Sequence, residues 1–446
     1  MRSISKSGFI RGIKCPKSLY LHYNQPEDRD EPDEARQNLL NSGHDVGRLA
    51  QQLFPGGIDA SRGLPASYTE NIAFTAELIR DGCPVIYEAA FGDGETLCYL
   101  DILVREGDEW QAYEVKASTR VKEYHLQDAA FQYFVMKRSG VSLKCFSMIH
   151  LNSGYIRQGE LDLSSLFDIE PVTRTILRRQ AEIAENLASL QQMLAVGMVP
   201  GITMGQQCYR SYPCDFIEFC MKDHIPATPP ADPFPDNRNQ DELDAFRHKL
   251  EYPLYFMDFE TFMPAVPLYE NTRPYQKLPF QYSLHVLDTP DGTLRHYEFL
   301  SNPPEDPRRA FIVSLLGRLG NRGSILVWNQ SFEKTILREL GRDFPEHQPG
   351  IFPLFGRVAD LMVPFRRKHL YTTEMNGSHS LKAVLPAIVP ELSYASLGIS
   401  DGGSACMAYE ALFTEPDPEV LLTIRQDLLE YCKLDTLSMV RILEKI

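Results

Sequence analysis

The segment Tyr255–Thr261, YFMDFET, decides how the second half of the chain folds. Its apolar and aromatic residues predict a strand over Leu254–Thr261. Asp258 and Glu260 stand at alternate positions, so both side chains point to the same face of that strand. A core face cannot hold two carboxylates unless positive charge neutralises them. Two divalent cations ~4 Å apart would do so and would form a centre that cleaves phosphodiesters.

The bulk composition is that of a soluble globular protein with two or three domains, since the 446 residues are 43% hydrophobic and 24% charged. We find no apolar run long enough for a membrane span, and Met1–Lys6 lacks the apolar stretch of a secretion signal. These two features favour a cytoplasmic location and no association with a membrane. A net charge of −15 argues against a general nucleic-acid coat protein. It leaves a nuclease open, because metal-binding carboxylates themselves add negative charge.

Both halves of the chain show α/β patterns, separated by a Pro-rich segment. We expect an N-terminal domain over 1–224, a linker over 225–249 and a C-terminal domain over 250–446. Expected elements of the first domain are helices at 7–23, 35–53, 126–137 and 172–196 and strands at 85–91, 97–105, 110–117 and 143–151. Those of the second are strands at 254–261, 280–287, 294–299 and 324–328 and helices at 306–319, 332–340, 381–387 and 419–445.

Further candidate site residues follow the first acidic pair along the chain. Tyr431 and Asp435 are four residues apart in a helical pattern and therefore face the same way. Glu333 follows Asn329 just after a predicted buried strand. Taken singly, Glu333 and Asp435 are better explained as surface carboxylates or helix caps, and Asn329 is consistent with a turn former.

Taken together, Asp-x-Glu on a first strand, Asn329 with Glu333, and a helical Tyr-x-x-x-Asp resemble the motifs of the DEDD exonuclease superfamily in its tyrosine branch. That resemblance covers 250–446 and implies an RNase H-like fold with 3′-to-5′ exonuclease chemistry. It implies that two Mg²⁺ or Mn²⁺ ions are held by four carboxylates: Asp258, Glu260, Glu333 and Asp435. Tyr431 would orient the attacking water. Glu333 departs from the family, which normally has Asp, and lengthens the arm by one carbon.

A second acidic cluster lies in the first domain. Asp101 ends one predicted strand, and Glu114 and Lys116 share a face of the next. An exposed hairpin carrying a Glu114–Lys116 ion pair is one interpretation. The other is a catalytic site, because the spacing resembles the PD-(D/E)XK nuclease family, with its restriction-endonuclease-like fold, in the RecB-like form. This resemblance implies that Asp101 and Glu114 hold a metal ion and that Lys116 assists the chemistry. Glu88 is a further candidate ligand.

Two family features are less well matched. The glutamine on the following helix corresponds to Gln132 or Gln127. RecB-like enzymes also carry a histidine one turn into an early helix, after a glycine. Gly43 stands at the expected place, but His44 is displaced, which leaves an altered metal site open.

Three cysteines, Cys208, Cys214 and Cys220, are separated by five residues each, and Cys15 precedes a proline. One cysteine near the start and three near the end of a predicted nuclease domain resemble the iron–sulfur RecB-like nucleases, including the CRISPR-associated type. This resemblance implies a structural 4Fe–4S cluster. Four thiolates also suit zinc, and free buried thiols are a third alternative. The other five cysteines are predicted to fill the core: Cys83, Cys98, Cys145, Cys406 and Cys432. Cys432 has no base partner, so we expect no nucleophilic role for it.

As a whole, the arrangement resembles an uncharacterised bacterial family that fuses a RecB-like nuclease to a DEDD-type exonuclease. The sequence therefore predicts a metal-dependent nuclease with single-stranded DNA as the favoured substrate. One alternative is a non-catalytic binding or scaffold protein in which one or both nuclease folds are inactive. An RNA 3′ exonuclease is the other.

Overall fold

The computed structural model describes residues 3–446 apart from 31–33, 62–66, 210–212, 223–234 and 396. It divides into two compact α/β units, in agreement with the predicted fold class. Unit 1 comprises Met1–Pro229 with Ala265–Tyr275, and unit 2 comprises Pro230–Pro264 with Gln276–Ile446. The excursion Ala265–Tyr275 was expected to belong to the second domain. It groups with unit 1 because, for example, the Tyr275 hydroxyl donates to the Ala117 carbonyl at 2.6 Å.

Unit 1 is built on a seven-stranded sheet of order β2-β3-β4-β5-β6-β7, with β1 paired to β4. The strands β3, β4 and β5 are antiparallel, whereas β5 and β6 are parallel. The strands are β1 Ile4–Ser5, β2 Ile58–Asp59, β3 Val85–Gly92, β4 Thr96–Glu106, β5 Glu109–Lys116, β6 Leu143–Leu151 and β7 Phe167–Pro171.

The α-helices of unit 1 are α1 Lys6–Lys14, α2 Pro16–Asn24, α3 Glu34–Gln51, α4 Tyr68–Arg80, α5 Glu123–Arg138, α6 Leu163–Leu166, α7 Thr173–Leu177, α8 Gln180–Val196 and α9 Ile217–Lys222. The single helix expected over 7–23 is divided at Cys15, whose extended φ of −160° reflects the constraint that Pro16 places on the residue before it. Helix α4 and strand β7 were not predicted. Ser67 and Glu70 form a capping box that fixes the start of α4.

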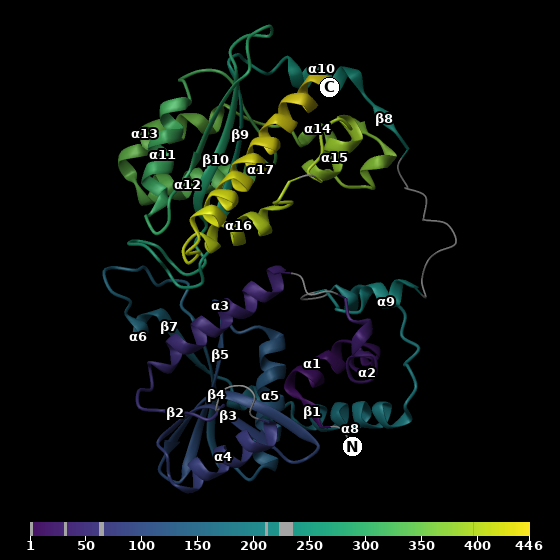
Figure 1. The fold of residues 1–446 in the computed structure, drawn as a ribbon, viewed down its shortest axis with the longest axis vertical. Helices are drawn as coiled ribbons and strands as arrows, with labels where there is room; N and C mark the ends of the chain where they lie inside the picture. Colours follow the sequence, from purple (N-terminus) through teal and green to yellow (C-terminus); the bar gives the residue numbers. More distant parts are fainter. Residues whose placement is uncertain (1–2, 31–33, 62–66, 210–212, 223–234, 396) are drawn as a thin grey trace. The chain divides into compact units, whose positions relative to one another are not determined.

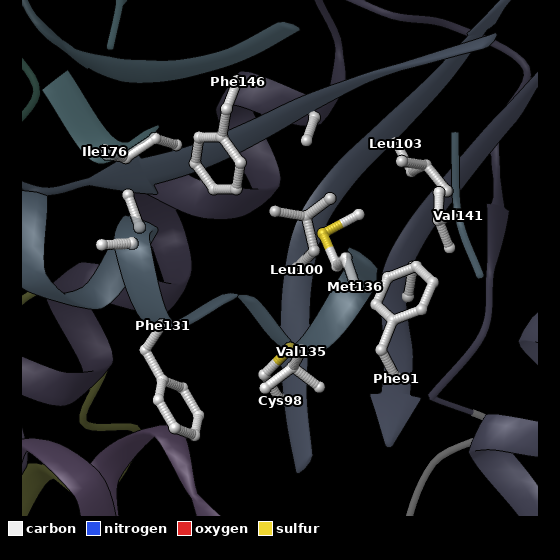
Figure 2. Close-up of a cluster of buried hydrophobic side chains, with 14 of the residues drawn as sticks. Phe91, Cys98, Leu100, Leu103, Phe131, Val135, Met136, Val141, Phe146 and Ile176 are labelled. Carbon is white, nitrogen blue, oxygen red and sulfur yellow. The ribbon is translucent and has the colours of Figure 1, made fainter. Parts of the chain in front are cut away.

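The main core of unit 1 lies between the sheet and helices α1, α5 and α8. Figure 2 shows the part of it formed by residues of β3, β4, β6 and α5. Phe131 on α5 stacks on Phe9 of α1 at a ring-centroid distance of 4.5 Å. Leu100 of β4 and Phe146 of β6 are fully buried in the same cluster. Helices α1 and α5 thus cover the sheet face that carries the predicted acidic residues of this unit.

Unit 2 contains a five-stranded sheet of order β11-β10-β9-β12-β13. Strands β9, β10 and β11 are antiparallel, and β12 and β13 continue parallel to β9. These strands are β9 Leu254–Phe262, β10 Leu278–Leu287, β11 Arg295–Leu300, β12 Ile325–Val327 and β13 Val358–Asp360; β8 Asn237–Arg238 and β14 Leu370–Tyr371 form a separate pair.

The α-helices of unit 2 are α10 Gln240–Arg247, α11 Pro307–Arg318, α12 Gln330–Asp343, α13 Gln348–Ile351, α14 Val363–Arg366, α15 Leu381–Ile388, α16 Gly402–Ala411 and α17 Pro418–Lys445. The chain also forms 3₁₀ turns at Pro26–Asp28, Gln206–Cys208, Pro345–His347, Phe352–Gly356 and Thr373–Met375. The C-terminal helix α17 runs along β9 and β10 (Figure 1). Helix α10 falls within the expected linker and buries Leu243 fully, so regular structure resumes before residue 249. Residues 223–234 of that linker lie outside the described residues.

Alternation along β9 decides where its carboxylates point. Tyr255 and Met257 pack in the cluster that contains α11 and α12. Leu254 and Phe256 pack in the cluster that contains the end of α17. Asp258 and Glu260 continue the second set, because side chains two apart share a face. The acidic pair therefore lies on the face that α17 covers.

Candidate functional sites

The acidic cluster of unit 2 joins the strand β9 to the helix α17. Ligand atoms of Asp258, Glu260 and Cys432 all lie within 4.8 Å of one another. The Cys432 thiol is 3.8 Å from Oδ2 of Asp258. Glu260 and Asp435 are buried, at 8% and 6% exposure. Cys432 is buried as predicted, but its thiol faces carboxylates and not only apolar side chains.

The pKa shifts show that the three carboxylates of β9 and α17 repel one another across a shared volume. Burial and the charge of Asp435 raise the pKa of Asp258 well above its usual value. Burial, Asp258 and Asp435 do the same to the pKa of Glu260. Burial raises the pKa of Asp435 to about 6, although hydrogen bonds and the Lys382 charge oppose the shift. Each charge therefore disfavours the others.

Glu333 lies in the first turn of α12 and interacts electrostatically with Asp258. It is 1% exposed, and burial followed by the charges of Asp258 and Asp360 raises its pKa. Its Oε2 is buried and has no hydrogen-bond partner among the described residues. Such an oxygen is costly unless something absent from the protein chain pairs with it.

Asp360 was not predicted as part of this region. It ends β13 and is 5% exposed, and its Oδ1 accepts from the backbone N–H groups of Asn329 at 3.2 Å and Met362 at 3.1 Å. Asn329 has a positive φ of 86°, and its side chain accepts from the Ser331 hydroxyl. The turn-forming interpretation thus describes Asn329, whose side chain accepts a hydrogen bond from Ser331.

Two tyrosines and one lysine surround the Asp435 carboxylate. The Tyr394 hydroxyl donates to Oδ1 of Asp435 at 2.6 Å, and Tyr431 also forms a hydrogen bond with Asp435. Lys382, which is exposed, places its ammonium 5.7 Å and 5.5 Å from the ring centroids of Tyr394 and Tyr431. Tyr394 and Lys382 were not predicted, because they belong to segments without a motif and only the fold brings them to the cluster.

In unit 1, Glu88 and Asp101 lie where the alternation of core-facing residues along β3 and β4 is interrupted. Glu88 has a positive φ of 49°, which is unusual for a residue with a long side chain. The residues of β3 that face the main core switch from the even position Ile86 to the odd positions Ala89 and Phe91 at this point. Asp101 lies at the matching switch in β4, between Leu100 and Leu103. Strained backbone of this kind concentrates at functional sites.

Glu114 of β5 is held between two lysines. Lys6 donates to its Oε1 at 2.6 Å, Lys116 to the same oxygen at 3.0 Å, and Gln132 to its Oε2 at 2.5 Å. Burial alone would raise the pKa of Glu114, but the charges of Lys6 and Lys116 lower it to about 2. Lys116 also donates to Asp128 at 2.8 Å. Of the two glutamines considered from sequence, Gln132 contacts the site acid. Lys6 was not predicted, since nothing in the sequence links it to a strand a hundred residues later.

Asp101 and Glu88, the other two acids of this site, have less positive charge beside them than Glu114 has. Burial and Glu114 raise the pKa of Asp101 to about 7; its Oδ2 accepts from the Val115 N–H at 2.5 Å. Burial and Asp101 raise the pKa of Glu88 to about 8. His44 is exposed on α3. It therefore does not supply the histidine that RecB-like enzymes place beside these acids.

The four predicted cysteines meet at one small cavity in unit 1. Cys15 separates α1 from α2, and the other three come from the segment 206–222; all four line the cavity. All are free thiols. Among the described residues, the group of possible metal ligands that lie within 4.8 Å of one another is Asp258, Glu260 and Cys432. No three of the four clustered thiols are that close in the same part of the chain.

A larger cleft, of about 530 Å³, shares several lining residues with this cavity and is also lined by the two lysines that contact Glu114. Lys6 and Lys116 line one part of it, and Lys14 and Cys214 line another. Tyr124, an exposed aromatic residue, also lines the cleft. Basic groups beside an aromatic ring are the features that bind a single nucleic-acid strand.

Comparison with known proteins adds one result for the chain. Residues 255–380 match a domain of unknown function, DUF2779. The match includes Asp258, Glu260 and Glu333, and it ends before Tyr431 and Asp435. It covers less than a third of the chain. No curated protein matches the sequence. None of the helices in the described residues combines the length and apolar character needed to cross a membrane.

Proposed function

We propose that unit 2 is a metal-dependent phosphodiesterase that removes nucleotides from the 3′ end of a nucleic-acid strand, with DNA as the favoured substrate. The observation that carries this proposal is the electrostatic interaction of four carboxylates from three separate elements, one partly buried and three buried: Asp258, Glu260, Glu333 and Asp435. The raised pKa values show what this interaction costs without counter-charge. Divalent cations remove that cost, because hard ions prefer oxygen ligands.

The fold supports this proposal. Three antiparallel strands followed by two parallel ones, in the order β11-β10-β9-β12-β13, agree with the RNase H-like architecture that the sequence resemblance implies. The first acids lie on the central strand β9 and the last lies on the C-terminal helix α17 beside it. The unpartnered Glu333 oxygen and the close grouping of Asp258, Glu260 and Cys432 fit a metal centre.

When bound, two Mg²⁺ or Mn²⁺ ions would activate a water and stabilise the leaving oxygen. Asp258 and Glu260 would hold the ions from the strand, and Asp435 from the helix. Tyr394 fixes the Asp435 carboxylate by its 2.6 Å hydrogen bond. Burial and the nearby carboxylates raise the pKa of Tyr431 far above its usual value. Tyr431 therefore keeps its proton, which it donates to Asp435, and would orient a water through its hydroxyl oxygen rather than act as a base.

For unit 1 we propose a RecB-like nuclease site formed by Asp101, Glu114 and Lys116, with Glu88 as an added ligand. Two observations favour the alternative of a strand-binding module without catalysis. Lys6 already pairs with the proposed metal ligand Glu114 at 2.6 Å, and His44 is exposed. In that alternative the basic cleft beside Lys116 holds the strand.

The cysteine cluster is proposed to hold a 4Fe–4S centre that joins the two ends of unit 1. A single zinc ion with Zn–S bonds of ~2.3 Å would need thiolates about 3.8 Å apart in a tetrahedron. No three of the four described thiols are that close. An iron–sulfur cube binds each thiolate to a different iron and so accepts a wider spacing.

A nuclease assay with Mg²⁺ or Mn²⁺ on matched, end-labelled single-stranded DNA and RNA tests the proposal. We expect Asp258→Asn to lower the rate by at least ~10³-fold, because metal catalysis supplies several kcal/mol and each ~1.4 kcal/mol is tenfold. Asp291→Asn, which changes an exposed carboxylate of the same unit, is the matched control. Lys116→Ala tests unit 1 separately. Equal rates for wild type and Asp258→Asn would refute the role of unit 2, and preference for RNA would select the alternative substrate.

A further inference from the structure

Cys432 occupies an unusual place for a buried cysteine. It lies on α17 between Tyr431 and Asp435 and is fully buried. Its thiol lies 3.8 Å from Oδ2 and 3.9 Å from the backbone oxygen of Asp258. The thiol donates weak hydrogen bonds to these oxygens, so it occupies a polar position and not one that merely fills apolar space.

The spacing of these atoms suits a shared ion. An ion held at ~2.3 Å from sulfur and ~2.0–2.2 Å from oxygen places such ligand pairs about 3.5 to 4.4 Å apart, depending on the angle between the bonds. The Sγ···Oδ2 distance of 3.8 Å lies within that range. The Glu260 carboxylate completes a set of three ligand atoms within 4.8 Å.

A second, independent observation comes from α12. Oε2 of Glu333 is buried without a hydrogen-bond partner among the described residues, and the Asp258 charge raises the pKa of Glu333. The two carboxylates therefore interact electrostatically. Asp258, Glu260 and Cys432 supply the three grouped ligand atoms, and a transition-metal site with three protein ligands keeps a further position open.

We propose that Cys432 is a metal ligand, and that it makes one position of the centre selective for Zn²⁺, Co²⁺ or Cd²⁺ over Mg²⁺. This inference rests on the metal centre of the proposed function. Sulfur is a soft ligand that favours such ions, whereas Mg²⁺ prefers oxygen alone. Binding converts the Cys432 thiol to a thiolate, and the released proton passes to solvent.

The test is to titrate the full-length protein with Co²⁺ and record sulfur-to-cobalt charge-transfer absorption for wild type, Cys432→Ser and Asp258→Asn. Cys145→Ser is the matched control, because Cys145 is a partly buried free thiol that belongs to unit 1 and not to its cysteine cluster. Contributions from the cysteine cluster of unit 1 are common to all the proteins and cancel in difference spectra. We expect Cys432→Ser to lose absorption that Cys145→Ser retains. Its affinity for Cd²⁺ should fall about tenfold or more, while Mg²⁺ affinity changes by less than about threefold.

An unchanged cobalt spectrum and Cd²⁺ affinity in Cys432→Ser, with loss of binding in Asp258→Asn, would overturn the thiolate ligand and leave the metal centre intact. If none of the variants alters metal uptake, both proposals fail. ¹¹³Cd NMR of the unaltered protein provides a measurement that needs no substitution. It separates a site with one thiolate from a four-thiolate site, and a spectrum without the one-thiolate resonance would refute the inference.

Discussion

Two buried acidic clusters in this chain solve the same electrostatic problem in opposite ways. In unit 1, Lys6 and Lys116 lie 2.6 Å and 3.0 Å from Glu114 and lower its pKa to about 2. In unit 2, burial raises the pKa of Asp435 to about 6, and the cation that opposes this shift is the exposed Lys382. The chain supplies its own counter-charge in the first cluster. In the second, the nearby cation is an exposed lysine, which is why we propose that divalent cations from solution neutralise the carboxylates there.

The largest effect should come from removing the paired charge in unit 1. Glu114→Gln leaves two lysines without their common partner, and we expect unit 1 to lose about 3 kcal/mol of stability. The chain has two tryptophans, Trp110 in unit 1 and Trp328 in unit 2. Urea unfolding followed by Trp110 fluorescence in a Trp328→Phe background therefore reports unit 1 alone. Unfolding curves that coincide with those of the parent would show that the lysines do not depend on Glu114.

Removing a carboxylate charge from the acidic cluster of unit 2 should raise the stability of that unit and not lower it. Without divalent ions, Asp258→Asn removes one of several repelling charges and should stabilise unit 2 by about 1 to 2 kcal/mol. Added Mn²⁺ should reverse the order, since an ion at 100 times its Kd stabilises the wild type by about 2.7 kcal/mol. Trp328 fluorescence in a Trp110→Phe background measures both. A loss of stability in EDTA would mean that Asp258 is already compensated by the chain.

A pH series sharpens the contrast within unit 1, because Glu88 lacks the compensation that Glu114 has. Burial raises the pKa of Glu88 from 4.5 to about 8. Between these values the folded chain retains a proton that the unfolded chain has released, so stability falls as the pH rises. Glu88→Gln should remove this dependence and stabilise unit 1 by on the order of 1 to 2 kcal/mol above pH 8, with no difference below pH 4.5. Parallel pH profiles for the two proteins would exclude Glu88 as the cause.

The smallest effect is expected for Lys382→Ala. This lysine is exposed, and exposed charges contribute less than about 1 kcal/mol because water screens them. Thermal unfolding at low and high salt is the measurement. A loss of several kcal/mol would show that unit 2 also carries an internal counter-ion, and the comparison between the clusters would no longer hold.

Most elements of the fold were predictable because their periodicity is strong. The aromatic and apolar run around Asp258 and the long pattern that ends in α17 lie where alternation and helical spacing place them. Strand β13, at three residues, is too short for periodicity to detect. The break at Cys15 followed from a single proline and was overlooked.

The candidate site residues also fall into those that the sequence predicts and those that only the fold reveals. Those carried by motifs on regular elements, such as Asp258 and Asp435, were candidates from sequence. Lys6, Tyr394 and Asp360 were not, because each contacts the sites from a distant segment without a motif of its own. The thiol of Cys432 was assigned to the core because its neighbours in sequence are apolar, whereas the helix turns it toward Asp258.

Mn²⁺ uptake measured by electron paramagnetic resonance reports whether the carboxylates of unit 2 hold divalent cations, as we propose. Wild type and the Asp291→Asn control should bind the same number of ions, and Asp258→Asn should bind at least one fewer. Equal uptake by all three proteins would show that Asp258 holds no ion.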